Sequence, residues 1–109
     1  MTALTIGCSG FPVAQARYYS QLRAVEIAST FYQPPRLATA ERWRAQAPKD
    51  FTFTVKAWQL ITHLAGSPSY RRLTEDLAPG QLSQCGHFQN TPEVKRAWAK
   101  TRAIARALK

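Results

Sequence analysis

The sequence predicts an α/β fold with a parallel sheet, and two observations lead to it. Three short segments alternate apolar and polar residues with the period of a strand, and stretches with helical spacing lie between them. The first two connections are long enough for a helix that returns the chain, as parallel strands require. The length of 109 residues predicts one domain, over residues 1–109.

The expected strands cover residues 4–9, 25–30 and 51–58. In each strand, one alternating set of side chains is apolar and the other is mostly polar, so the two sets face opposite sides of the sheet. The apolar sets are expected to pack against the helices. The polar sets include Thr5, Ser9, Glu26, Thr30, Thr54 and Lys56.

Two helices are expected between the strands. Pro12 lies near the start of the first, over residues 13–23, and Pro48 ends the second, over residues 37–47. After the third strand, residues 64–90 have a weak pattern and predict a long loop, which is often functional at this length.

The last helix has the clearest signals. Thr91 is a good N-cap residue, and Pro92 suits the first helical position. Its apolar stripe contains Val94, Ala97, Trp98, Thr101, Ile104, Ala105 and Leu108. Six of the fifteen basic residues also lie here: Lys95, Arg96, Lys100, Arg102, Arg106 and Lys109.

The polar strand faces leave two architectures open. Parallel strands that are covered on both faces usually contain nearly continuous apolar runs, and these strands do not. A barrel with an unusually polar interior accommodates the pattern, although ordinary barrel interiors hold bulky branched side chains. A small half-open sheet with one wet face accommodates it as well.

Four motifs resemble one protein family. They are IGCSGF at 6–11, VEIASTFY at 25–32, PKDFTFTVKA at 48–57 and ITH at 61–63. In this order and at these spacings, the chain resembles the N-terminal part of DUF72 proteins. It departs from them at Ala28, where many members have Asn, and at Phe11-Pro12, where many have Trp-Ser-Tyr.

The resemblance implies a TIM-type barrel of roughly twice this length, of which the chain supplies three parallel strand-helix units out of eight. The expected fold is therefore a partial, incomplete barrel, with the loop at 64–90 as a lid over its mouth. Three strands leave two open edges, which favour self-association or assembly with a complementary barrel portion over a stable, catalytically competent monomer. The family carries no established activity.

Active sites of TIM barrels lie at the carboxyl ends of the strands, a rule that selects Ser9, Gly10, Thr30, Phe31, Tyr32, Trp58 and His63. The catalytic candidates are His63 and, deeper in the barrel, Glu26 and Lys56. Glu26 and Lys56 lie on the polar faces of neighbouring strands, where they form a general base beside an electrostatic stabiliser, a lysine with a depressed pKa, or a structural ion pair. His63 is either an acid-base group or a solvated loop residue.

The substrate-binding candidates are Ser9, Thr30, Tyr32 and Trp58. Tyr32 and Trp58 either stack on a sugar or a base or pack beneath the loops. Arg71 and Arg72, beside Tyr70, could bind a phosphate.

Other features exclude several classes of protein. Cys85 and His87 offer at most two metal ligands, whereas structural zinc takes four, so neither a metal nor a cofactor is expected. Two distant cysteines, Cys8 and Cys85, do not form a disulfide framework, and no secretory signal or membrane helix is apparent, so a cytoplasmic protein is expected.

Two functions remain. The first is an enzyme, or part of one, that acts on a small polar or anionic substrate of sugar-like or phosphate-like character. The second follows from the net charge of +9, which attracts polyanions: weak nucleic-acid binding by the last helix through Lys95, Arg96 and Lys100. No zinc-finger, helix-turn-helix or RNP-type aromatic motif accompanies these cations, and they also fit the solvated face of a terminal helix.

Overall fold

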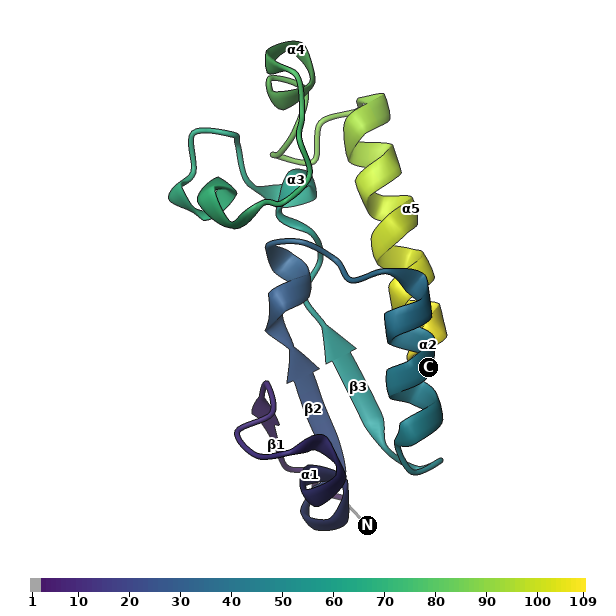
Figure 1. Cartoon of the computed structure of the whole chain (residues 1–109). Coiled ribbons are helices and arrows are strands. Elements are labelled where there is room, and N and C mark those ends of the chain that lie inside the picture. Colours follow the sequence, from purple (N-terminus) through teal and green to yellow (C-terminus); the bar gives the residue numbers. More distant parts are fainter. Residues whose placement is uncertain (1–2) are drawn as a thin grey trace.

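A computed structural model describes residues 3–109 and contains one parallel sheet, with helices against one of its faces (Figure 1). The strands, with β2 in the middle, are β1 (Gly7–Ser9), β2 (Ala24–Ile27) and β3 (Thr52–Val55). Cys8 lies beside Val25, and Val25 lies beside Phe53, so the alternation of the three strands is in phase. The predicted α/β class with a parallel sheet is confirmed.

The helices are, in chain order and with η for a 3-10 helix, α1 (Gln15–Gln21), η1 (Ala28–Phe31), α2 (Leu37–Gln46), α3 (Gln59–Thr62), η2 (Pro68–Arg72), α4 (Pro79–Leu82) and α5 (Pro92–Ala107). Within residues 3–109, three of these helices, α1, α2 and α5, lie where the sequence patterns predict them, and four short ones do not follow from those patterns. The hydroxyl of Thr91 accepts a hydrogen bond from the Val94 N–H at 3.2 Å, and Pro92 takes the first helical position. The predicted start of the last helix is therefore confirmed.

The first strand is shorter than its alternation predicts. Pairing begins with Gly7 opposite Ala24, where β2 itself begins, so the residues before Gly7 have no strand beside them. Leu4 and Ile6 are accordingly 82% and 64% exposed. At Gly7 the strands approach so closely that a Cβ would lie 2.2 Å from the Ala24 carbonyl oxygen, and only glycine fits.

The second strand also ends early, because the chain turns into η1 after Ile27. The Thr30 hydroxyl holds this turn: it lies 2.8 Å from the Ile27 oxygen and 2.7 Å from the Lys56 oxygen, and it accepts from the Lys56 N–H at 3.1 Å. The prediction that Thr30 lies on the polar face of a strand is therefore wrong. Its side chain is buried and joins the ends of β2 and β3.

The apolar face of the sheet is buried against α1, α2 and α5. One cluster of buried side chains there comprises Tyr18, Val25, Ile27 and Phe51, and another comprises Ala40, Ile104 and Leu108. The Tyr18 hydroxyl accepts from the Cys8 N–H at 2.7 Å and donates to the Ala24 oxygen at 2.5 Å. One side chain of α1 thus joins β1 to β2.

A third buried cluster lies beyond the carboxyl ends of the strands, between α3, the segment 64–90 and α5. Its members are Trp58, Leu60, Ile61, Cys85, Val94 and Ala97. Tyr70, Leu73 and Leu77 pack against it from the segment that the sequence predicts to be a long loop. This segment contains η2 and α4 and has an apolar anchor of its own.

The chain returns from that segment through three residues with positive φ, Gly86, His87 and Phe88. Their N–H groups donate to the carbonyl oxygens of Leu60, Thr62 and Ile61 at 2.6, 3.1 and 2.8 Å. The last carbonyls of α3, which a helix end leaves free, are satisfied in this way. A Cβ on Gly86 would lie 2.2 Å from the His63 oxygen, so this position requires glycine.

The other face of the sheet is open. Figure 1 shows α2 and α5 on one side of β3 and no helix over the opposite face of the strands. Within residues 3–109, β1 and β3 are both edge strands, and the sheet does not close into a barrel. A closed barrel needs more than three strands, because each strand forms only a part of its circumference.

Candidate functional site

Three polar side chains lie next to one another on the open face. Ser9 pairs in register with Glu26, and Glu26 pairs with Thr54, so one row crosses all three strands. The Ser9 hydroxyl donates to a carboxylate oxygen of Glu26 at 3.0 Å. All three residues are exposed and line an open depression of about 280 Å³. The predicted polar face is therefore present at these positions.

A second group surrounds the ring of Phe31, in η1, at the carboxyl end of the strands. The ammonium nitrogen of Lys56 lies 5.1 Å from the ring centre, close enough for a cation–π interaction. The His63 ring lies 4.9 Å away and the Tyr32 ring 5.2 Å away, both edge to face. Residues that follow β2, β3 and α3 meet here because all three elements end at the same side of the molecule.

Tyr32 extends this group to the segment 64–90. The guanidinium carbon of Arg72, at the end of η2, lies 3.8 Å from the centre of the Tyr32 ring. The Tyr32 backbone is held in turn, because its carbonyl oxygen accepts from Trp58 Nε1 at 3.2 Å and from Gln59 Nε2 at 3.0 Å. The backbone of the residue whose ring Arg72 contacts is therefore held by two hydrogen bonds.

The cations of this group have no carboxylate partner among residues 3–109. The ion pairs there within 4.0 Å are Arg23–Asp50 and Arg96–Glu75. Lys56 accordingly makes no ion pair with Glu26, although both side chains are exposed. Glu26 is bonded to Ser9, and Lys56 lies over Phe31. Lys56 and Arg72 thus have no carboxylate within 4.0 Å among the described residues.

His63 is placed by its neighbours on both sides. Its Nδ1 lies 2.6 Å from the Thr62 hydroxyl, and its carbonyl oxygen accepts from the Tyr70 hydroxyl at 2.7 Å. His63 is an exposed residue, and its ring lies edge to face with Phe31. Burial of Tyr70 raises the pKa of its phenol to about 12, so this hydrogen bond persists well above neutral pH.

Two of the predicted ligand-binding residues lie inside the protein. Trp58 is 0% exposed in the third buried cluster, and Thr30 is buried in the turn after β2. Trp58 donates a hydrogen bond to the backbone of Tyr32, and the Thr30 hydroxyl is bonded to the backbone of residues 27 and 56. Both side chains therefore hold the backbone that carries the residues around Phe31. The structure thus brings Phe31 together with Tyr32, Lys56 and His63, and it places Ser9 and Glu26 further down the open face.

The rule that active groups lie at the carboxyl ends of the strands selects Phe31, although composition and alternation do not. Phe31 directly precedes Tyr32 in the motif at 25–32, where the chain leaves β2, and a barrel site draws on the residues that follow a strand. Arg72 also appears in the predicted Arg71-Arg72 pair, but only the fold brings it to Tyr32.

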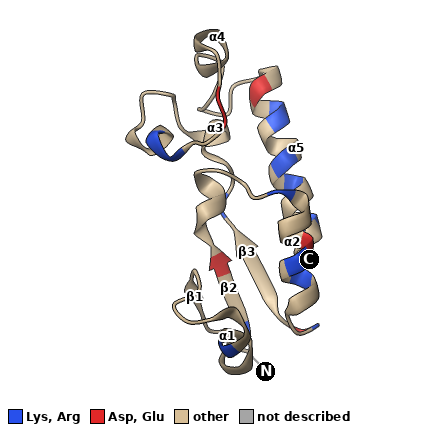
Figure 2. Ribbon diagram, in the orientation of Figure 1, with Lys and Arg blue, Asp and Glu red and all other residues tan. Residues whose placement is uncertain are grey.

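The predicted nucleic-acid residues do not form one surface. Figure 2 shows basic residues along the whole length of α5. Arg96 is bonded to Glu75 at 3.0 Å, and both Arg96 and Lys100 lie over the buried Trp58 ring, at 5.6 and 5.2 Å. Lys95 lies on another side of the helix, beside Trp98.

No group of three or more His, Cys, Asp or Glu residues within 3–109 could hold a metal ion. In the same range, every helix is too short or too polar to cross a membrane.

The comparisons with known proteins agree with the resemblance seen in the motifs. The family model described as "Protein of unknown function DUF72" matches residues 14–108, nearly the whole chain. No curated protein and no solved structure matches.

Proposed function

The chain belongs to the DUF72 family, and from this membership and the geometry above we propose that it binds a small anionic ligand at the carboxyl end of its sheet. The observation that carries the proposal is the pair of cations without a carboxylate within 4.0 Å among the described residues, Lys56 and Arg72, each held against an aromatic ring. A phosphate or carboxylate group of a sugar-like molecule supplies the missing negative charge.

The position supports a catalytic site of the TIM-barrel type. Ligands of parallel α/β proteins bind at the carboxyl ends of the strands, in barrels and in open sheets alike. In a barrel, the open face with Ser9, Glu26 and Thr54 would become the interior below that site. The polarity of this face is consistent with such a role.

Each residue then has a role that its surroundings favour. Lys56 and Arg72 bind the anionic group, and the rings of Phe31 and Tyr32 contact the apolar face of a sugar. His63 exchanges a proton with the ligand, and Glu26, oriented by Ser9, acts as a base towards a part of the ligand deeper in the site.

A titration of the isotope-labelled protein with inorganic phosphate, a sugar phosphate and the corresponding neutral sugar tests the proposal. We expect the backbone resonances of residues 31, 32, 56, 63 and 72 to shift with the two anions. Lys56→Gln should weaken this binding by about tenfold, as expected for the loss of one charge-assisted hydrogen bond.

Lys49→Gln is the matched control, because Lys49 is an exposed cation at the opposite end of β3. It should leave anion binding unchanged. Equal loss of binding in both variants would mean that the anions respond only to the net charge of the protein, and the proposed site would be rejected.

The second candidate function is polyanion binding by α5. The observation that favours it is a row of exposed cations, Lys95, Arg102 and Arg106, at spacings that keep them on one side of a helix. A row of this kind is suited to the phosphates of nucleic acids, without recognition of a base sequence.

A further inference from the structure

We propose that Gln33 is a positioning residue of the anion site, which orients Arg72 so that its guanidinium binds two neighbouring oxygens of a phosphate or carboxylate. This role rests on the anion site proposed above and determines which ligands that site favours. Three observations support it. The donors of Arg72 are free, the Gln33 side chain binds two backbone amides just beyond Arg72, and Gln33 itself is held in place.

The guanidinium of Arg72 is held by its flat side. Its central carbon lies 3.8 Å from the centre of the Tyr32 ring, which is van der Waals contact, and a guanidinium can stack on an aromatic ring at this distance. The guanidinium groups that make hydrogen bonds within residues 3–109 are those of Arg23, Arg44 and Arg96. Arg72 therefore keeps its N–H edge for a ligand, and a planar edge of this kind suits two oxygens of one oxyanion.

The side chain of Gln33 binds the chain just beyond Arg72. Its Oε1 accepts hydrogen bonds from the N–H groups of Thr74 and Glu75, at 3.3 Å each. Gln33 directly follows Tyr32, and Thr74 lies two residues after Arg72. The two stretches of chain that meet in the cation–π contact are thus joined a second time, immediately beside it.

The second attachment gives the guanidinium a direction. Contact with the Tyr32 ring alone leaves Arg72 free to turn in the plane of the stack, and its N–H edge then has no preferred direction. The bonds of Gln33 to two consecutive amides fix the path of the backbone after Arg72, and with it the side from which Arg72 reaches the ring. A fork that is oriented before the ligand arrives loses less entropy on binding.

Gln33 can orient Arg72 because its own backbone is fixed. Its N–H group donates to the Ser29 oxygen at 3.2 Å, in the turn that begins with η1. The carbonyl group just before it accepts from Trp58 and Gln59. The residue after it is the buried Pro34, and a proline restricts the backbone of the residue that precedes it.

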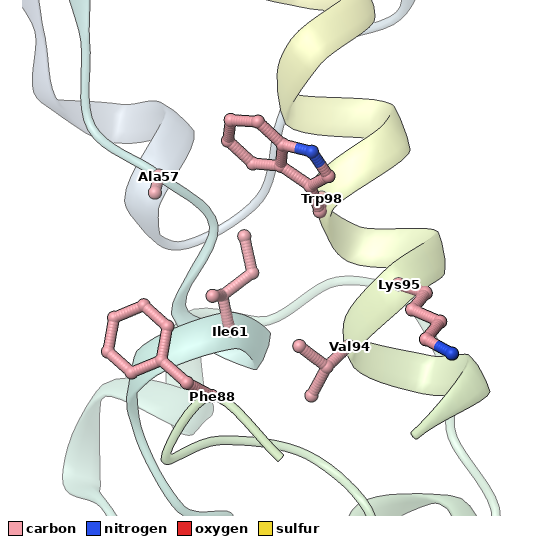
Figure 3. Close-up of a pocket in the computed structure, with 6 residues that line it drawn as sticks. All are labelled: Ala57, Ile61, Phe88, Val94, Lys95 and Trp98. Carbon is pink, nitrogen blue, oxygen red and sulfur yellow. The ribbon is translucent and has the colours of Figure 1, made fainter. Parts of the chain in front are cut away.

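The other attachments of the segment 64–90 do not supply this direction. In Figure 3, Phe88, where the segment returns, lies beside Ile61 of α3, across a groove of about 310 Å³ from Trp98 of α5. Leu73 packs on the third buried cluster, and apolar contacts of this kind are not directional. Within residues 3–109, the hydrogen bonds between the segment and the residues that follow β2 are those of Gln33.

A double-mutant cycle on the full chain tests the proposal, with inorganic phosphate as the ligand and isothermal titration as the measurement. Gln33→Met keeps the length of the side chain and removes the acceptor. It should weaken phosphate binding by about fivefold, because the bond from Arg72 to the ligand is lost in part. In the Arg72→Gln background the same substitution should have no further effect, because no guanidinium remains to be oriented.

Gln81→Met is the matched control. The Gln81 Oε1 also accepts from a backbone N–H group of the segment 64–90, that of Ala78 at 3.0 Å, and its loss should leave phosphate affinity unchanged. Arg72→Lys keeps the charge and removes the planar fork, so it should weaken phosphate binding as Gln33→Met does.

A second measurement needs no ligand. Protons over an aromatic face are shielded, so the Tyr32 ring should shift the side-chain resonances of Arg72 upfield. This shift should decrease in Gln33→Met and persist in Gln81→Met. If the native chain does not bind phosphate, the proposed function fails, and the shift still decides whether Gln33 positions Arg72.

Three results would overturn the role of Gln33. Unchanged Arg72 resonances in Gln33→Met would show that apolar contacts alone place Arg72. Equal weakening of phosphate binding by Gln33→Met in the native and the Arg72→Gln backgrounds would mean that Gln33 acts independently of Arg72. Full phosphate affinity in Arg72→Lys would reduce Arg72 to a point charge, for which orientation has no consequence.

Discussion

The guanidinium of Arg72 lies 3.8 Å from the centre of the Tyr32 ring, although α2, β3 and α3 separate the two residues along the chain. The contact joins the end of β2 to the segment 64–90 at the point where Lys56 and His63 also gather around Phe31. Trp58 and Gln59, which follow β3, hold the Tyr32 carbonyl and with it the backbone of the residue that Arg72 contacts.

Arg72→Gln should weaken the binding of inorganic phosphate by about tenfold, since it removes one of two cations at the proposed site. Arg71→Gln is the control. Arg71 is the exposed neighbour of Arg72 in the same 3-10 helix. The cation–π contact with the Tyr32 ring is made by Arg72. Isothermal titration of both variants measures the difference, and equal affinities would argue against a role for Arg72.

Tyr18→Phe should reduce the free energy of unfolding by about 1–3 kcal/mol, because the Cys8 N–H and the Ala24 oxygen both lose their partner. Tyr19→Phe provides a matched comparison on the same helix. The Tyr19 hydroxyl is buried and has no hydrogen-bond partner within the described range, so its removal should be neutral or stabilising. Urea denaturation of both variants checks the prediction, which fails if the two substitutions have the same effect.

Gly86→Ala should destabilise the protein by at least about 2 kcal/mol, since it combines a left-handed backbone with a Cβ 2.2 Å from the His63 oxygen. Gly80→Ala, in α4, should be neutral or slightly stabilising, because nothing lies within 4 Å of the added Cβ and alanine favours a helix. Thermal melts of the two variants separate the effects.

Tyr70 makes stability depend on alkaline pH. Its pKa rises from 10.0 to about 12 on folding, since burial penalises the phenolate, so the folded state holds a proton that the unfolded state releases in this range. The contribution to stability is complete below pH 10 and is lost as the pH rises towards about 12. Tyr70→Phe should therefore show a smaller loss of stability between these pH values, measured by denaturation at each pH.

Charge reversal should distinguish two sides of α5 in polyanion binding. A variant with Lys95, Arg102 and Arg106 replaced by Glu should elute from immobilised DNA at a much lower salt concentration than the native chain. A variant with Arg96 and Lys100 replaced by Glu should lose less, because Arg96 is already paired with Glu75. Similar retention of all three proteins would show that α5 is solvated surface only.

The parts of the fold that local chemistry specifies could be predicted from the sequence. Period-two alternation identified Val25, Glu26 and Ile27 with their correct faces, because burial on one side of a sheet imposes that period. Thr91 and Pro92 marked the start of α5, because a helix start requires a cap and tolerates proline.

Other parts depend on contacts between distant segments. Alternation carried on to Thr30 and Trp58 assigns both to the polar face, yet β2 and β3 end at Ile27 and Val55, and the turns that follow bury both side chains. Within the candidate site, Tyr32, Lys56 and His63 could be selected because each follows a strand or its first turn. Arg72 could not be assigned to Tyr32, since η2 has no apolar period and is placed by its packing on α3 and α5.

The amides of Gly86, His87 and Phe88 return the chain to α3, the helix that it left at His63. The two ends of the stretch 64–85 are therefore held together by hydrogen bonds, and the stretch forms a closed loop that begins and ends at α3. Insertions or deletions around Gly66 and Gly80 change the length of this loop and do not displace β3 or α5. Family members can thus diverge in this stretch, and exchange the residue that meets Tyr32, while they keep the same sheet.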